Sequence, residues 1–210
     1  ARFGIEADDS AGTPLLSTPQ GTLLRLLSEA ALRPGDPVPL VALLKHPLAR
    51  FGLPADDMRA AVTALELTAL RGGTAEIDIS TLEPLLETAL AQQATDRHVP
   101  QWRAALPETA IPLALDLTAR IAEAVEPLAG VLVQQSRTGR RFSSKLAVSD
   151  WAERTGRALE AVAVDERGDL AALWSGEAGD SLANLLKSVI ETDGEIEADG
   201  PQWCDIIEAL

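Results

Sequence analysis

The chain has 210 residues and a formal net charge of −14, and nearly half of its residues are apolar, mostly Leu and Ala. This length can bury a core without metals, and the single cysteine, Cys204, excludes a disulfide framework within the chain. Domains that grip phosphates are usually basic, so the acidity excludes a surface that binds nucleic acid throughout, though not a local basic patch. Leu and Ala favour helices, whereas strands favour Val, Ile and aromatic residues, so an all-α fold is expected.

Apolar residues recur at helical spacing along most of the chain, interrupted by Pro, Gly and polar clusters. Thr18 can cap a helix that begins with Pro19, and Ser80 and Glu83 have the spacing of a capping box. In chain order, the predicted helices cover residues 19–32, 39–46, 55–71, 80–94, 112–133, 145–164, 170–174 and 176–190, and the chain ends in a helix that holds Trp203, Ile206, Ile207 and Leu210. The stretches 1–17, 95–109, 134–144 and 191–199 are predicted as loops or linkers.

The second predicted helix is almost entirely apolar and ends on Lys45-His46-Pro47. Its composition predicts burial on all sides, and Pro47 cannot continue the helix. Lys45 and His46 lie where positive charge stabilises the C-terminal end of a helix dipole. His46 is therefore interpreted as a helix-end cation rather than as a ligand or a catalytic base.

No residue pattern in the sequence indicates a catalytic centre, a metal site or a cofactor. Two histidines and one cysteine cannot supply the ligand spacing of a zinc site. Asp56 and Asp57 suit the first turn of a helix, and the acidic run 191–197 lacks the ligand spacing of a calcium loop. Gly176-Glu177-Ala178-Gly179 is no P-loop, because no Lys-Ser/Thr follows it.

One segment, residues 136–145, reverses the charge of the chain, with four cations, several hydroxyls and one aromatic ring. Arg, Ser and Thr are common phosphate contacts, and an aromatic ring can stack on a base. The candidate nucleic-acid contacts are Arg137, Arg140, Arg141, Phe142 and Lys145, and the following helix adds Arg154 and Arg157. The alternative is a solvated loop that pairs with acidic helices.

Several short blocks occur in the order in which one protein family carries them. They are Gly4-Ile5, Asp8-Asp9-Ser10-Ala11-Gly12, Pro14-Leu15, Thr18-Pro19, Gly21, Leu43-Leu44-Lys45-His46-Pro47-Leu48, Gly52, Leu65-Glu66, Leu70-Arg71-Gly72, Leu173-Trp174 and Gly176-Glu177-Ala178-Gly179. Together they resemble the AddB family of double-strand-break repair proteins, most closely its alphaproteobacterial type. The matches span most of the chain, although residues 75–165 carry little recognisable motif.

The resemblance implies an internal fragment of the family's helicase-like region, similar to the 2B insertion of UvrD- and RecC-like superfamily-1 helicases. Residues 1–210 would form a single helical subdomain, with possible sub-lobes at 1–95 and 110–210. The ATP-binding motifs and nuclease carboxylates of the family have no counterpart here, so no catalytic residue is carried over and the fragment is not expected to be an enzyme.

The resemblance also implies a role and partners. The expected role in processing broken DNA ends is non-catalytic, and it consists in shaping a DNA channel or the contact with the AddA-type helicase–nuclease subunit. The implied setting is the bacterial cytoplasm, and no membrane span or signal peptide is expected. Two alternatives remain open, namely an acidic helical protein-interaction module without DNA contact and an independent enzyme.

Overall fold

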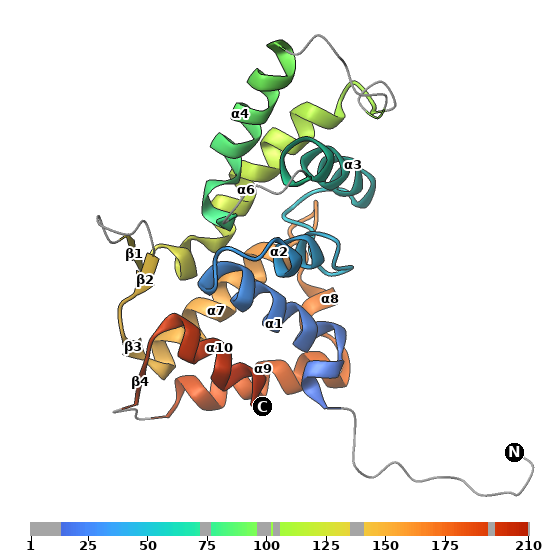
Figure 1. The fold of residues 1–210 in the computed structure, drawn as a ribbon. Helices are drawn as coiled ribbons and strands as arrows, with labels where there is room; N and C mark the ends of the chain where they lie inside the picture. Colours follow the sequence, from blue (N-terminus) through green and yellow to red (C-terminus); the bar gives the residue numbers. More distant parts are fainter. Residues whose placement is uncertain are drawn as a thin grey trace, which may run out of the picture.

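The computed structural model describes residues 14–71, 77–95, 102, 106–134, 141–192 and 196–209, and most of them are helical, as predicted (Figure 1). The helices are η1 (Leu15–Ser17), α1 (Pro19–Leu32), α2 (Pro37–Leu44), α3 (Ala55–Leu65), η2 (Glu66–Leu70), η3 (Ile79–Thr81), α4 (Leu82–Thr95), α6 (Ala110–Ala129), α7 (Val148–Ala163), α8 (Ala171–Trp174), α9 (Gly176–Ile190) and α10 (Gly200–Glu208). Two short antiparallel sheets pair β1 (Leu132–Gln134) with β2 (Arg141–Ser143) and β3 (Leu146–Ala147) with β4 (Glu197–Ala198).

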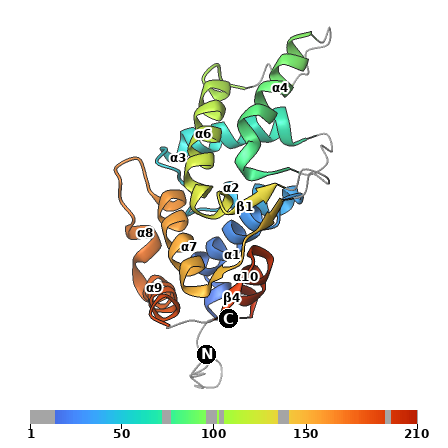
Figure 2. The same ribbon diagram turned by 90° about the vertical axis from the view of Figure 1, so that its left-hand side faces the viewer.

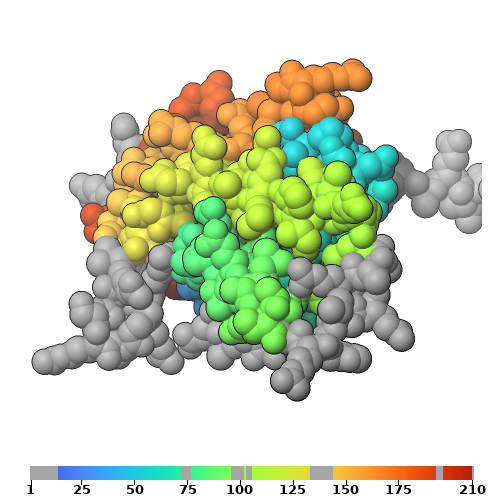
Figure 3. All heavy atoms as spheres, turned by 90° about the horizontal axis from the view of Figure 1, so that it is seen from above, coloured from blue at the N-terminus to red at the C-terminus, as the bar shows by residue number. Residues whose placement is uncertain are grey.

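Helices α3, α4 and α6 lie at one end of the molecule, and α1, α7, α9 and α10 lie at the other (Figure 1, Figure 2). Helix α6 packs against α3 and α4 and also against α7, so it joins the two ends. Its outer face, together with α4 and α3, forms the surface seen in Figure 3. Helix α1 packs against α2, α7, α9 and α10, and the buried apolar side chains form one connected cluster.

Two buried indole hydrogen bonds join α7 to the last elements of the chain. The Nε1–H group of Trp151 donates to the carbonyl oxygen of Ala198 at 2.8 Å, and that of Trp203 donates to the Thr155 hydroxyl at 3.0 Å. Both indoles are at most 2% exposed, so each N–H needs a partner inside the protein. These bonds connect α7 to β4 and to α10.

Local signals predict several helix starts correctly. The Thr18 hydroxyl accepts the N–H group of Gly21 at 3.1 Å, and Pro19 is the first residue of α1. The prediction that Ser80 is the N-cap of the fourth helix is wrong. Asp78 caps this segment, because its carboxylate accepts the N–H group of Ser80 at 2.9 Å. The helix therefore begins with the 3₁₀ turn η3 and becomes α-helical at Leu82.

The second helix differs from its prediction in start and in burial. It begins at Pro37, because the Asp36 carboxylate accepts the N–H group of Val38 at 2.8 Å and caps it. Leu40, Leu43 and Leu44 are buried, but Val38 is 69% exposed, so the prediction of burial on all sides is wrong. An apolar helix is buried on all sides only where neighbouring elements cover every face of it. In α2 they cover only the face that carries Leu40, Leu43 and Leu44.

Two further segments depart from the predicted helices. The third helix changes at Glu66 into a five-residue π-helix, η2. The long helix predicted to reach residue 133 ends at Ala129, and the strands β1 and β2 occupy part of the segment predicted as a loop. Strands of three residues depend on pairing with each other rather than on local propensity, so helical periodicity could not reveal them.

The block around Gly176 and Gly179 is required by the geometry of the turn between α8 and α9. Gly176 has a φ of +74°, a conformation that favours glycine. A Cβ atom on Gly179 would lie 2.4 Å from the backbone carbonyl carbon of Trp174. The absence of a side chain at Gly179 therefore lets α9 begin directly against the end of α8.

We expect Gly179→Ala to destabilise the protein by about 1–3 kcal/mol, because the new methyl group overlaps backbone atoms. The matched control is Gly156→Ala in α7, where the nearest atom to an added Cβ is Leu186 Cδ1 at 3.9 Å. This control should be neutral or gain up to about 1 kcal/mol from helix propensity. Urea denaturation measures both, and equal stabilities of the two variants would contradict the close approach.

Candidate functional site

The segment that sequence analysis singled out for DNA contact lies in and around the β1–β2 hairpin, between α6 and α7 (Figure 1). Arg141 is paired with Gln134 and Phe142 with Val133 in the backbone register. Residues 127–149 contain no carboxylate. The hairpin and its flanks are therefore the longest part of this acidic chain from which negative charge is missing.

The five predicted contact residues fall in three places. Arg141 and Phe142 belong to β2. Lys145 lies between β2 and β3 and is exposed. Arg137 and Arg140 lie outside the described residues. The structure thus places Arg141, Phe142 and Lys145 in one hairpin and the segment that follows it.

The two additional arginines of α7 have partners within the fold. Arg154 Nη1 donates to the carbonyl oxygen of Pro127 at 3.1 Å, in the last turn of α6. The last carbonyls of a helix have no partner in the helix itself and attract cations, so Arg154 stabilises the end of α6. Arg157 forms an ion pair with Glu153, one turn earlier in α7. The expectation that these two arginines extend the basic patch stays a prediction.

A second candidate site, which the sequence did not reveal, is a pocket of about 420 Å³ between α2 and α3. Its floor consists of four buried apolar side chains, from Leu44, Ala49, Met58 and Val62. Its rim carries Lys45, His46, Pro47, Arg50, Ala55, Arg59 and Thr63. We call it the α2–α3 pocket. Three of its rim residues are cations and none is a carboxylate.

Each cation of the α2–α3 pocket is held by a carboxylate that does not line the pocket. The pairs are Lys45 with Glu66 (2.6 Å), Arg50 with Glu166 (2.9 Å) and Arg59 with Asp56 (2.8 Å). Arg50 also donates from Nε and Nη2 to the carbonyl oxygen of Leu53. Ion pairs this exposed contribute little to stability, but they orient the cations around the pocket.

The imidazole of His46 accepts a hydrogen bond, which a protonated imidazole cannot do, so its interpretation as a helix-end cation is wrong. Its Nδ1 atom accepts the N–H group of Leu48 at 3.3 Å, which requires that Nδ1 carry no proton. Burial lowers the pKa of His46 below its ordinary value, because a charged imidazole is poorly solvated there. The proton therefore lies on Nε2, which makes His46 a hydrogen-bond donor on the pocket rim.

The turn after His46 is anchored to the end of α7. The N–H groups of Arg50 and Phe51 donate to the carbonyl oxygen of Val162 at 2.8 and 2.9 Å, and that of Gly52 donates to Val164 at 2.7 Å. Phe51 adopts a φ of +48°, which costs about 1–3 kcal/mol for a bulky residue. These bonds, with burial of the Phe51 ring, hold the turn and fix the position of Arg50.

Among the described residues, no three His, Cys, Asp or Glu side chains converge in a way that could hold a metal ion. Cys204 is 1% exposed, and burial raises the pKa of its thiol to about 12, so it is a core residue as the sequence suggested. No helix in the described part of the chain is long and apolar enough to cross a membrane.

Comparison with known proteins adds no relative. No protein-family model, no curated protein and no solved structure matches this chain.

The α2–α3 pocket escaped sequence analysis for a physical reason. Lys45 and Arg59 belong to different helices, and only the anchored turn between those helices brings them to one rim. The sequence does contain one signal of a basic site. The segment 45–59 holds three cations, and its two carboxylates, Asp56 and Asp57, are next to each other.

We expect the stability of the protein to fall between about pH 7.5 and pH 5.5, partly because of His46. The unfolded chain binds a proton at His46 more readily than the folded chain, whose pKa is lowered. The contribution of His46 is therefore present above the unfolded pKa and lost as the pH falls. Urea denaturation across this range should show a smaller loss for His46→Asn, whose amide oxygen can still accept the N–H group of Leu48. Parallel pH profiles would contradict a lowered pKa.

Proposed function

We propose that this chain is a non-catalytic helical subdomain of an AddB-type helicase–nuclease subunit. In this role it would resemble the 2B insertion of UvrD- and RecC-like helicases and act in double-strand-break repair in the bacterial cytoplasm. It would shape a DNA channel or the contact with the AddA-type subunit. The support for the family is the ordered series of sequence blocks, of which Leu43–Leu48 and Gly176–Gly179 are the most specific in the described part.

The β1–β2 hairpin is the single observation that carries DNA contact. A two-stranded ribbon has the width to enter the major groove, and cations without neighbouring carboxylates attract phosphates. Arg141 lies on β2, and the exposed Lys145 follows it, within the carboxylate-free residues 127–149. The proposal therefore assigns the hairpin, with Arg137 and Arg140 between its strands, to the phosphate backbone of DNA.

The blocks shared with the family have structural roles where they are described, which agrees with a scaffold rather than an active site. Thr18 caps α1, and Gly179 allows α9 to begin against α8. Lys45-His46-Pro47 ends α2, and the turn that follows is anchored on α7. The fold needs residues that cap helices or allow close packing of helices, and this need does not depend on the chemistry that the rest of the parent protein performs.

The alternative is an acidic helical module that contacts a protein and no DNA. The observation in its favour is the exposed face of α2, where Val38 lines a mainly apolar hollow. The other lining residues are Pro37, Val41, Ala42, Leu70, Glu66 and Arg71. Exposed apolar surface of this kind often marks protein interfaces. In the parent protein this face of α2 would contact the AddA-type subunit.

The first test is DNA binding by the 210-residue chain at several salt concentrations. We expect an Arg137→Ala/Arg140→Ala/Arg141→Ala variant to bind DNA more weakly and to have a salt slope shallower by about 3, because each phosphate contact contributes about 1. Fluorescence anisotropy with labelled single- and double-stranded oligonucleotides from about 50 to about 200 mM salt measures this slope.

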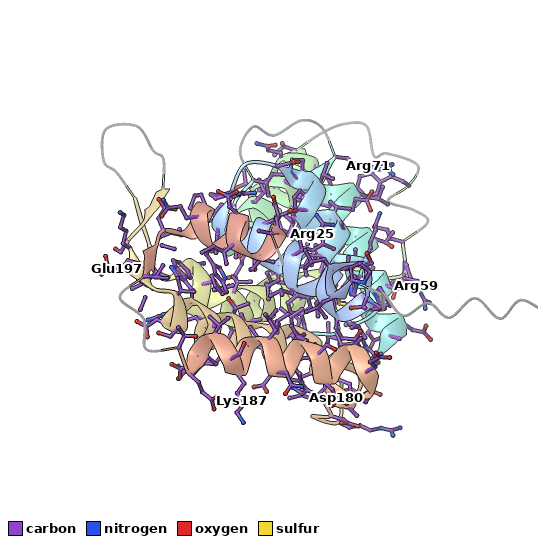
Figure 4. All side chains as sticks on the ribbon, turned by 90° about the horizontal axis from the view of Figure 1, so that it is seen from below. Arg25, Arg59, Arg71, Asp180, Lys187 and Glu197 are labelled. Carbon is purple, nitrogen blue, oxygen red and sulfur yellow. The ribbon has the colours of Figure 1, made fainter. Side chains whose placement is uncertain are left out.

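The control removes the same charge elsewhere, in an Arg71→Ala/Arg167→Ala/Lys187→Ala variant. Arg71 and Lys187 are 68% and 70% exposed and lie on different sides of the molecule (Figure 4), and Arg167 is also exposed. This variant should keep the slope of the unaltered chain. If both variants lose affinity equally, or if the unaltered chain shows no salt-dependent binding, the hairpin is not a DNA contact.

The second test separates the two candidate functions by co-purification with an AddA-type subunit. A contact through apolar surface should resist about 1 M salt, because screening weakens charge pairs and leaves hydrophobic contacts intact. We expect Val38→Asp to weaken this contact, whereas Ile196→Asp, at a residue of similar exposure (69% against 65%), should not. Equal retention of both variants would place the AddA contact away from α2.

A further inference from the structure

The α2–α3 pocket combines an apolar floor with four rim side chains that act only as hydrogen-bond donors. Lys45, Arg50 and Arg59 can only donate, and so can His46, because its acceptor Nδ1 is already occupied by the N–H group of Leu48. The carboxylates that hold the cations lie outside the lining. A ligand that satisfies this rim must therefore supply acceptors, and negatively charged acceptors are bound most strongly.

The floor of the pocket sets a second requirement. Leu44, Ala49, Met58 and Val62 offer apolar surface, and a volume of about 420 Å³ lies within the range of small-molecule and side-chain pockets. A free phosphate would leave this surface unfilled. A nucleobase would normally stack on a large aromatic ring, and no Phe, Tyr or Trp lines the pocket.

We propose that the α2–α3 pocket binds a partner peptide in which one apolar side chain is flanked by carboxylates. The apolar side chain fills the floor, and the carboxylates meet Lys45, Arg50 and Arg59. Arg59 is 74% exposed, and its ion-pair partner among the described residues is Asp56, which is 88% exposed, so its guanidinium can turn to a ligand at little cost. This site goes beyond the proposed function, because it requires neither the β1–β2 hairpin nor DNA.

The pocket and the hairpin are on different sides of the molecule. Arg59 lies at the edge opposite Glu197 in Figure 4, and Glu197 belongs to β4, on the side where β1 and β2 also lie in Figure 1. A peptide on the pocket and DNA on the hairpin would therefore not compete for the same surface. Failure of one site can be recognised while the other is intact.

The experiment uses Met58 as its reporter, because Met58 is the only methionine of the chain and lies in the pocket floor. A chain labelled with methyl-¹³C methionine gives one methyl resonance from this residue. The probe is a short capped peptide with one Leu between two pairs of Asp. We expect a saturable shift of the Met58 methyl resonance, with affinity lowered at least about fivefold when Asn replaces Asp. Replacing the Leu of the peptide by Gly should abolish the shift.

The matched protein variants are Arg59→Glu and Arg157→Glu, at side chains of similar exposure (74% and 67%). We expect Arg59→Glu to weaken peptide binding at least about fivefold and Arg157→Glu to leave it unchanged. The hairpin triple variant should bind the peptide like the unaltered chain.

Three outcomes would overturn the proposal. They are the absence of a saturable Met58 shift with the acidic Leu peptide, equal affinity for the Asn peptide, and a tighter response of Met58 to a single-stranded oligonucleotide than to the peptide. The last outcome would identify the pocket as a nucleic-acid site. The comparison of peptides uses the unaltered protein, so it does not depend on whether a variant folds.

Discussion

The burial of helix α7 is the constraint on which the rest of the structure depends. Its indole Trp151 and its hydroxyl Thr155 are fully buried, and each is satisfied by a bond to a segment more than forty residues away. An unsatisfied polar group in such a place costs about 1–3 kcal/mol, so β4 and α10 must dock on α7 in one register. The same helix supports the end of α6 through Arg154. The C-terminal elements therefore form around α7 and not as an independent unit.

The end of α7 also determines the shape of the α2–α3 pocket. The carbonyl groups of Val162 and Val164 accept the N–H groups of residues 50–52, and these bonds fix the turn that joins α2 to α3. Without that anchor, the strained φ of Phe51 would relax and Arg50 would lose its place on the rim. The Lys45-His46-Pro47 sequence stops α2 just before this turn. Lys45, His46 and Pro47, which end α2, thus also line the α2–α3 pocket.

The sequence predicted the features that depend on a few neighbouring residues. Thr18 caps α1, and Asp56 and Asp57 fall in the first turn of α3. Helix α9 has the predicted bounds, and α8 and α10 lie within three residues of their predicted positions. The sequence-based predictions failed for features that depend on residues far apart in the chain. The exposure of Val38 depends on which elements cover α2, and the pairing of β1 with β2 depends on two strands that are each only three residues long. The neutral state of His46 depends on burial and on one bond to Leu48, neither of which composition reveals.

The fold also distributes charge in a way that the net charge of −14 conceals. Residues 14–71 carry six cations and five carboxylates, and residues 127–149 carry four cations and no carboxylate, so the excess of negative charge lies elsewhere. Screening over about 8 Å at physiological ionic strength isolates such regions from a distant acidic surface. An acidic protein can therefore contain two separate sites that attract anions, here the β1–β2 hairpin and the α2–α3 pocket. Under the proposed function, the acidic remainder would repel nucleic acid from the other faces and confine DNA to the hairpin. The donor groups of the α2–α3 pocket would then be left for the proposed carboxylate-bearing partner.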